Sequence, residues 1–188
     1  MPGDSRGAVP IVLIDGRSGA GKSVLARALA DGWAEADLIR LDDIYPGWDG
    51  LEAGSRHVRD EVLTPLATGR PARWRRWDWA VGEPGAWHAV DPTRPLIIEG
   101  CGALSRSNRA LASFGVWVEL DAAARKSRAL ARDGAAYAAH WERWAAQEAA
   151  FIDREQPEAR ADLIVDAAAP FETALAGLLR DRIRRAPR

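Results

Sequence analysis

The sequence contains a single cysteine and only two lysines among its 188 residues. Cys101 cannot form an internal disulfide, and no cysteine and histidine set has the spacing of a zinc site. These shortages exclude a disulfide-rich secreted scaffold and a zinc-finger module, and they fit a reducing cytoplasm. We interpret the preference for arginine over lysine, 24 to 2, as a composition bias of the genome rather than a functional feature.

The sequence also lacks an excess of charge of either sign and any long hydrophobic run. Its net charge is −1, with 28% charged and 47% hydrophobic residues, which argues against nucleic-acid binding through bulk positive charge. The first apolar run, residues 8–14, is too short to span a membrane. We therefore expect one cytoplasmic domain over residues 1–188, with no nucleic-acid or membrane partner and with an unknown oligomeric state.

Short apolar runs alternate with longer helical patterns along the chain. The candidate strands are residues 9–14, 37–41, 95–99, 114–120 and 162–166. The candidate helices are residues 22–34, 56–68, 122–133, 135–155 and 171–185. This alternation predicts an α/β fold in which helices cover both faces of a five-stranded, mostly parallel sheet. Ligands of such sheets bind at the carboxyl ends of the strands.

The most specific pattern is the stretch GRSGAGKS, residues 16–23, which matches the phosphate-loop pattern G-x-x-x-x-G-K-S. It follows a candidate strand and opens a candidate helix, which is the context that this motif requires. The glycines allow backbone N–H groups to surround phosphate oxygens, and the helix adds its positive dipole end. Lys22 is then expected on the β- and γ-phosphates and Ser23 on Mg²⁺; the alternative is a glycine-rich turn with an accidental lysine. The predicted nucleotide-binding residues are Gly16, Arg17, Ser18, Gly19, Ala20, Gly21, Lys22, Ser23 and Val24.

An acid ends the buried strand in PLIIEG, residues 95–100. This position puts Glu99 beside the phosphate loop, where a carboxylate can hold Mg²⁺ or its waters. The alternative is an acid that caps a turn at the end of the strand. The base-reading motif N-K-x-D of GTPase switches is absent from the sequence, which points away from that class.

Several stretches occur in the order found in uridine kinase and its relatives, a nucleoside and nucleotide kinase branch of the P-loop fold. Besides the phosphate loop they are LDDIY, GWDG, RRWDW, LIIEG and RKSRALARD, and they cover most of the chain from residue 9 to about residue 166. Only the phosphate loop is specific by itself, whereas the others are informative through their order and spacing. The chain thus resembles a uridine kinase-like P-loop kinase. The resemblance implies ATP and Mg²⁺ as cofactors, an acceptor-binding insert at about residues 43–94 and a small helical lid at about residues 121–145.

The resemblance also assigns the acids of the stretch RLDDIYPGWDG. Asp42 matches the family carboxylate that accepts the proton of the attacking sugar hydroxyl, and an acid at the end of the second strand suits this step. Asp43 is its neighbour without that role. Asp49 aligns with the ribose-binding Asp of the family, since a carboxylate can accept hydrogen bonds from two hydroxyls. Acids that cap a turn are the alternative for both Asp42 and Asp49.

The stretch RWRRWDW, residues 73–79, alternates rings and charges. As an extended strand it would put Trp77 and Trp79 on one face and Asp78 on the other. It matches a Tyr-Asp-Phe motif whose rings line the nucleobase pocket of the family, although AVGEPG replaces the histidine that follows, so pyrimidine specificity is not implied. A short basic aromatic strip for single-stranded nucleic acid is the alternative. The expected acceptor-binding residues are Asp42, Tyr45, Trp48, Asp49, Trp77, Asp78 and Trp79.

Arg125, Arg128 and Arg132 have the spacing of one helical face. Arg128 and Arg132 match the lid arginines of the family, which neutralise charge on the transferring phosphoryl group. A solvated, salt-bridged helix is the alternative. The second pair of lid arginines is replaced by GAAYAAH, and Arg143 is the candidate to take its place.

The remaining aromatic and titratable residues have structural explanations. The stripe Tyr137, Trp141, Trp144 and Phe151 recurs at helical intervals, which is typical of core packing. The three histidines are scattered and receive no catalytic role. Cys101 is expected to be a small buried residue.

These residues together predict an ATP- and Mg²⁺-dependent phosphotransferase for a small hydroxyl-bearing acceptor, with a nucleoside as first choice. The expected catalytic residues are Asp42, Lys22, Arg128 and Arg132, with Ser23 and Glu99 on the metal. One alternative is a kinase of the same fold for a nucleotide, another small metabolite or an antibiotic. The other is a non-catalytic ATP-binding regulator. The surplus arginines that could bind a phosphorylated acceptor are Arg56, Arg59, Arg73, Arg75 and Arg76.

Overall fold

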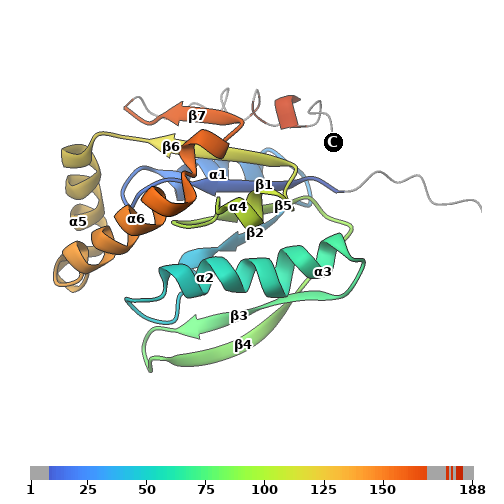
Figure 1. Cartoon of the computed structure of the whole chain (residues 1–188), viewed down its shortest axis with the longest axis horizontal. Helices are drawn as coiled ribbons and strands as arrows, with labels where there is room; N and C mark the ends of the chain where they lie inside the picture. The colour runs from blue at the N-terminus through green and yellow to red at the C-terminus, as the bar shows by residue number, and fades with distance from the viewer. Residues whose placement is uncertain (1–8, 169–176, 178, 180, 184–188) are drawn as a thin grey trace, which may run out of the picture.

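A parallel five-stranded sheet lies at the centre of the described part of the chain (Figure 1). The structure, a computed structural model, describes residues 9–168, 177, 179 and 181–183. In the order of the sheet, the strands are β2 (Asp37–Arg40), β5 (Leu96–Glu99), β1 (Ile11–Asp15), β6 (Phe114–Glu119) and β7 (Leu163–Asp166). Each matches a predicted strand, with bounds that differ by one or two residues. The predicted α/β fold with a five-stranded sheet is confirmed.

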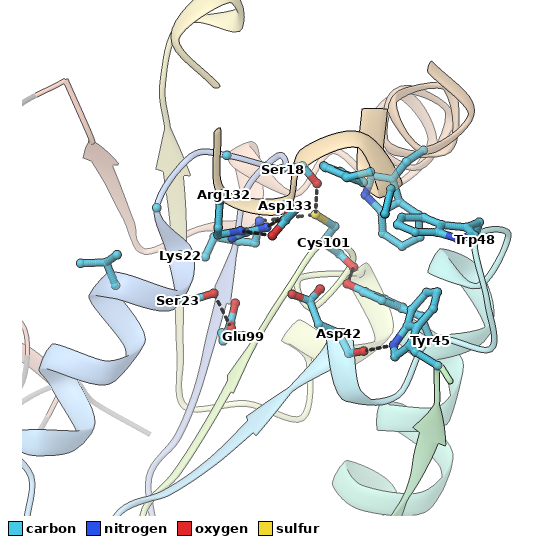
Figure 2. Close-up of a pocket in the computed structure, with 17 residues that line it drawn as sticks. Ser18, Lys22, Ser23, Asp42, Tyr45, Trp48, Glu99, Cys101, Arg132 and Asp133 are labelled. Atoms are coloured by element: carbon cyan, nitrogen blue, oxygen red, sulfur yellow. Dashed lines mark hydrogen bonds and ion pairs between the residues drawn. The ribbon is translucent and has the colours of Figure 1, made fainter. Parts of the chain in front are cut away.

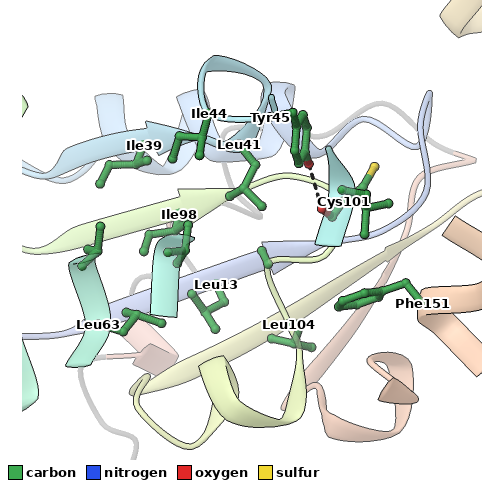
Figure 3. Close-up of a cluster of buried hydrophobic side chains, with 14 of the residues drawn as sticks. Leu13, Ile39, Leu41, Ile44, Tyr45, Leu63, Ile98, Cys101, Leu104 and Phe151 are labelled. Carbon is green, nitrogen blue, oxygen red and sulfur yellow. Dashed lines mark hydrogen bonds between the residues drawn. The ribbon is translucent and has the colours of Figure 1, made fainter. Parts of the chain in front are cut away.

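The central strands are apolar on both faces, as a covered parallel sheet requires. Val12 and Ile14 of β1 belong to one buried cluster, while Leu13 belongs to the cluster on the opposite face. The neighbouring strand β5 repeats this division, with Ile97 on the side of Val12 and Ile98 on the side of Leu13. Figure 3 shows the cluster that contains Leu13 and Ile98. Because side chains alternate along a strand, a shift of one residue would exchange the two faces, so the register is strongly fixed.

Helices cover both faces of the sheet. Helix α1 (Lys22–Asp31) packs on the Val12 side through Leu25 and Leu29. The opposite face is covered by a continuous helical segment and by one further helix. These elements are α2 (Leu51–His57), a π-helical segment (Val58–Leu63), α3 (Thr64–Ala67) and α6 (Trp141–Glu155). A short helix, α4 (Arg106–Arg109), contacts the π-helical segment. None of the helices in the described residues is long and apolar enough to cross a membrane.

The helices differ from the predicted ranges at several places, and α1 ends at Asp31 rather than at residue 34. The segment predicted at 56–68 begins earlier, at Leu51, and the short helix α4 was not predicted. Helix α5 (Ala122–Ala138) contains a non-helical residue, Gly134, with φ 65° and ψ −150°. The second predicted helix of this region, 135–155, therefore starts as the end of α5 and continues as α6. The helix predicted at 171–185 lies largely outside the described residues.

A two-stranded antiparallel hairpin follows the α2–α3 segment and packs against it (Figure 1). It consists of β3 (Ala72–Asp78) and β4 (Glu83–Val90), of which β4 was not predicted. The pairing is irregular between Arg75 and Trp77, and β3 ends before Trp79. The strict alternation that was expected to put both tryptophans on one face is therefore interrupted.

Candidate active site

The loop between β1 and α1 has the backbone geometry that its glycines permit. Gly21 adopts a left-handed conformation, φ 105°, immediately before the first residue of α1. Gly19 also has positive φ, and a Cβ there would lie 2.1 Å from the backbone oxygen of Arg125. A side chain at Gly19 would thus collide with α5, so the loop needs glycine at this position.

A buried acid fixes the base of this loop. The Asp15 carboxylate accepts hydrogen bonds from the backbone N–H groups of Gly16 at 2.7 Å, Leu104 at 2.8 Å and Gly102 at 3.1 Å. Burial raises the pKa of Asp15 to about 6, although these N–H groups act in the opposite direction. Asp15 therefore ties the loop to the segment that follows β5. No sequence pattern had singled out this residue.

Lys22 lies buried beneath the loop. Its Nζ donates a hydrogen bond to the backbone oxygen of Arg17 at 3.1 Å and lies 3.4 Å from Sγ of Cys101. Burial acts to lower the pKa of Lys22, but the nearby carboxylates, including Glu99 and Glu148, raise this pKa to a greater extent. The ammonium group is therefore charged at neutral pH. Burial also raises the pKa of the Cys101 thiol, which stays protonated and is no nucleophile.

Oxygen ligands lie next to the loop. Glu99, at the end of β5, accepts a hydrogen bond from the Ser23 hydroxyl at 2.8 Å and one from Nε of Arg40 at 3.2 Å, both on Oε1. A hydroxyl and a carboxylate beside a phosphate loop fit Mg²⁺, which commonly takes one or two protein oxygens and completes its shell with phosphates and water. Among the described residues no group of three or more acids, histidines or cysteines could hold a metal by itself. This donor set thus suits a metal that arrives with a nucleotide.

The loop opens into a cavity of about 360 Å³ (Figure 2). One side, which we call the loop wall, consists of Ser18, Gly19, Gly21, Lys22, Ser23 and Val24. The other side, the aromatic wall, consists of Tyr45, Trp48, Trp79, Tyr137 and Trp144. The remaining lining residues are Asp42, Glu99, Cys101, Arg132, Asp133 and Ala136. Figure 2 shows that the Asp42 carboxylate points into the space between the two walls.

The aromatic wall is held by hydrogen bonds and ring contacts. The Trp79 indole N–H donates to the backbone oxygen of Asp42 at 2.8 Å, which joins the hairpin to the turn that carries this acid. The buried Tyr45 hydroxyl donates to the Cys101 backbone oxygen at 2.7 Å. Trp48 stacks on Tyr137 of α5 with ring centroids 5.5 Å apart. The wall therefore combines rings from three separate parts of the chain, and one of its residues supports Asp42 directly.

The three arginines of α5 have three different environments. Arg132 lines the cavity and forms an ion pair with Asp133. Arg128 donates to the backbone oxygen of Ala167, away from the cavity lining. Arg125 is buried, and its guanidinium donates to the backbone oxygens of Leu120 and Ser18. Of the two predicted lid arginines, the structure brings only Arg132 to the cavity, while Arg125 holds the loop.

Several predicted site residues do not line the cavity. Asp49 forms an ion pair with Arg143 of α6, so these two residues neutralise each other outside it. Trp77 lines a separate cavity between the hairpin and α2, and Asp78 accepts a hydrogen bond from the Ala80 N–H. The other predicted residues that lie outside the lining are Gly16, Arg17, Ala20 and Arg128. None of the surplus arginines lines it either.

Sequence reasoning missed a second buried acid, Glu148 of α6. Its carboxylate accepts hydrogen bonds from the Ser18 backbone N–H at 2.7 Å and from Nε of Arg17 at 3.0 Å. It thereby attaches α6 to the phosphate loop. The signal was present, because Glu148 occupies one position of the aromatic stripe that includes Trp144 and Phe151, and an acid on a buried face requires partners.

No protein-family model and no curated protein matches the sequence of this chain. Its fold, in contrast, matches those of solved structures. A possible uridine kinase from Bacillus stearothermophilus is 17% identical, with a TM-score of 0.61, and the match covers 87% of this chain and 92% of that one. A sugar kinase from Janibacter sp. HTCC2649 is 15% identical, with a TM-score of 0.53 and coverage of 95% and 94%. A candidate fructose transport system kinase from Silicibacter sp. TM1040 is 22% identical, with a TM-score of 0.51 and coverage of 86% and 92%.

These similarities establish the fold. The chain has the α/β fold of P-loop kinases, as the phosphate loop and the alternation of strands and helices predicted. At identities of 15 to 22% the similarity does not extend to the acceptor, because one fold carries many specificities. The relation to uridine kinase in particular stays a prediction.

Proposed function

We propose that this protein is a cytoplasmic, ATP- and Mg²⁺-dependent kinase that transfers the γ-phosphate to a hydroxyl group of a small acceptor, with a nucleoside as first choice. The observation that carries the proposal is the position of Asp42. Its carboxylate points into the same cavity as Lys22 and Ser23 of the phosphate loop. A base, a cation for phosphate and a metal ligand thus share one enclosed space, which phosphoryl transfer requires.

The nucleotide half of the reaction would use the loop wall. The loop amides and the Lys22 ammonium would hold the terminal phosphates of ATP. Ser23 and Glu99 would hold Mg²⁺, which neutralises phosphate charge when bound. Arg132 lines the cavity, where its charge could stabilise the transferring group once its pairing with Asp133 is exchanged for phosphate.

The transfer itself would involve Asp42. The acceptor hydroxyl oxygen forms a bond to the γ-phosphorus, and the bond from that phosphorus to the bridging oxygen breaks, leaving its electron pair on ADP. The hydroxyl proton passes to the Asp42 carboxylate. Half of the Asp42 side chain is exposed, at 51%, so an acceptor can reach it.

The residues that line the cavity favour an acceptor that has a flat ring and no phosphate of its own. Five rings line this side of the cavity, and rings of this kind stack on nucleobases. Among the described residues, the cationic side chains that line the cavity are Lys22 and Arg132, and the proposal gives both to the nucleotide. A phosphorylated acceptor would need a further cation, and the surplus arginines lie elsewhere. This supports a nucleoside over a nucleotide.

The test is phosphate transfer from labelled ATP and Mg²⁺ to a panel of nucleosides, their monophosphates, sugars and hydroxylated antibiotics. We expect a labelled nucleoside monophosphate. Transfer to a different acceptor would keep the kinase and replace the nucleoside. ATP binding without transfer to any acceptor would instead favour a non-catalytic regulator, for which the missing second pair of lid arginines is the supporting observation.

A further inference from the structure

Arg40 lies between the two acids that the proposed reaction needs. It is the last residue of β2, and its Cα is the register partner of Glu99 on the neighbouring strand β5. Its Nε donates to Oε1 of Glu99 at 3.2 Å, and its Nη2 donates to Oδ2 of Asp42 at 3.4 Å. One guanidinium thus bridges the proposed metal ligand and the proposed base.

The two acids depend on Arg40 in different ways. Glu99 is buried, with its side chain 2% exposed, and a buried carboxylate needs a compensating charge. Asp42 sits in a short 3-10 turn (Leu41–Asp43) with half of its side chain in solvent. Within the described part of the chain, Arg40 supplies the hydrogen bond that the Asp42 carboxylate accepts from another side chain. Without that bond, the Asp42 side chain would be free to take other rotamers.

We infer that Arg40 is a positioning residue, which holds the Asp42 carboxylate at a fixed place relative to Glu99 and offsets part of the charge of Glu99. The inference rests on the proposed function, since it concerns the base and the metal ligand of that reaction. The planar guanidinium is suited to this task because it can bond two carboxylates at once, whereas a lysine ammonium is a single point charge.

Arg40 would contribute to the reaction in two ways, through the geometry of Asp42 and through the charge near Glu99. Loss of the bridge leaves Asp42 poorly aimed, and misplacement of a reacting group by about 1 Å can cost roughly 10²-fold in rate. Loss of the positive charge leaves Glu99 more negative toward Mg²⁺, so the metal should bind more tightly. A residue that served only the fold would weaken binding and turnover together.

Two substitutions distinguish these contributions. Arg40→Gln removes both the positive charge and the guanidinium that bonds the two carboxylates. For this variant we expect kcat to fall roughly 10²-fold and the apparent Kd for Mg²⁺ to fall about threefold to tenfold. Arg40→Lys keeps the charge and loses one of the two contacts; we expect kcat to fall about tenfold with the Kd for Mg²⁺ within about twofold of wild type. Arg94→Gln is the matched control, because Arg94 pairs with Asp37 and Asp91 outside the cavity and the substitution should change neither quantity.

The metal measurement needs no turnover. Mg²⁺ is titrated by calorimetry into each variant loaded with a non-hydrolysable ATP analogue, and crystal structures of these complexes show the Asp42 side chain. Tighter Mg²⁺ binding in Arg40→Gln together with a displaced Asp42 carboxylate supports the inference. An unchanged Asp42 position, wild-type kcat in Arg40→Lys, or Mg²⁺ binding weakened in proportion to kcat in Arg40→Gln overturns it. If the wild type transfers no phosphate to any acceptor, the proposed function fails, while the titration and the structures still decide the role of Arg40.

Discussion

The loop wall and the aromatic wall of the cavity differ in how many segments of the chain build them. The loop wall comes from one run of residues, 18–24, between β1 and the first turn of α1. The aromatic wall combines Tyr45 and Trp48 with Trp79 beyond β3 and with Tyr137 of α5 and Trp144 of α6. The first wall contains two glycines and a lysine, whereas every residue of the second carries an aromatic ring.

This difference corresponds to different chemical demands. Phosphate is the same in every nucleotide, so a backbone cradle of fixed shape can bind it. An acceptor differs from one kinase to another, and side chains on separate segments can change one at a time to suit it. Asp42 points into the space between the two walls, and Arg40 links it to Glu99. The comparison predicts that substitutions in the loop wall affect every reaction of the protein, whereas those in the aromatic wall affect acceptor recognition.

The largest effect is expected at Lys22. Lys22→Ala removes the buried cation that would hold the terminal phosphates, so phosphate transfer should fall by roughly 10³-fold or more, whatever the acceptor. Acceptor binding, measured by calorimetry, should persist because the aromatic wall is untouched. Lys126→Ala is the control, since Lys126 pairs with Glu142 outside the cavity. A fully active Lys22→Ala variant would contradict the assignment of the loop wall to phosphate.

The next largest effect on turnover is expected at Asp42, the proposed base, which belongs to neither wall. Asp42→Asn keeps the shape of the side chain but removes the base, so kcat should fall by about 10² to 10⁴-fold while the nucleotide still binds. The measurements are steady-state kinetics and titration with an ATP analogue. Asp43→Asn, the same change on the adjacent acid, serves as control and should keep most of the activity. Equal losses of kcat in the two variants would show that Asp42 is not the base.

A smaller effect, on nucleoside binding, is expected at the aromatic wall. Trp79→Ala removes a ring that contacts Trp48 and lines the cavity, so KM for a nucleoside should rise about tenfold, while KM for ATP stays within about twofold. Trp87→Ala is a matched control, because Trp87 is also 41% exposed but lies outside the cavity. The same rise in KM for the nucleoside in both variants would mean that the substitutions act by disturbing the hairpin and not by removing a ring from the cavity.

The smallest effect concerns the support beneath the loop wall. Because burial raises the pKa of Asp15 from 3.8 to about 6, the folded state binds more protons than the unfolded state between these values. The stabilisation from protonated Asp15 is complete below pH 3.8 and is lost as the pH rises through 6. Lowering the pH from 7 to 5 should therefore add about 1 kcal/mol to the unfolding free energy of the wild type relative to Asp15→Asn.

Urea unfolding of both proteins at pH 5, 6 and 7 measures this difference. Subtraction of the two curves removes the contributions of other acids, such as Asp60, whose pKa is lowered by its hydrogen bond with Arg59. A difference that does not change with pH would show that Asp15 stays ionised in the folded protein, held by its three N–H donors.

Much of the fold could be predicted from the sequence. Of the candidate site, the loop wall could be predicted well and the aromatic wall only in part. The strands of the five-stranded sheet were recognisable because each is a short apolar run bounded by polar residues, whereas β4 of the hairpin has no such pattern. The phosphate loop was recognisable because glycine spacing and a following lysine constrain the backbone locally. The aromatic wall was predicted in part, since Trp79 lines the cavity and Trp77 does not. The irregular pairing of β3 with β4 decides this, and no residue pattern within β3 reveals it.

The sequence by itself determined the parallel sheet, the loop at the end of its β1 strand and the acids at the ends of β2 and β5. Only the tertiary structure decided that Arg125 holds the loop, that Asp49 pairs with Arg143, and that Glu148 and Arg40 bind groups in or beside the loop. The physical reason is the range of the interactions. Periodicity and glycine spacing act over a strand or a helical turn, whereas the partner of a buried charge is set by packing between segments far apart in the chain.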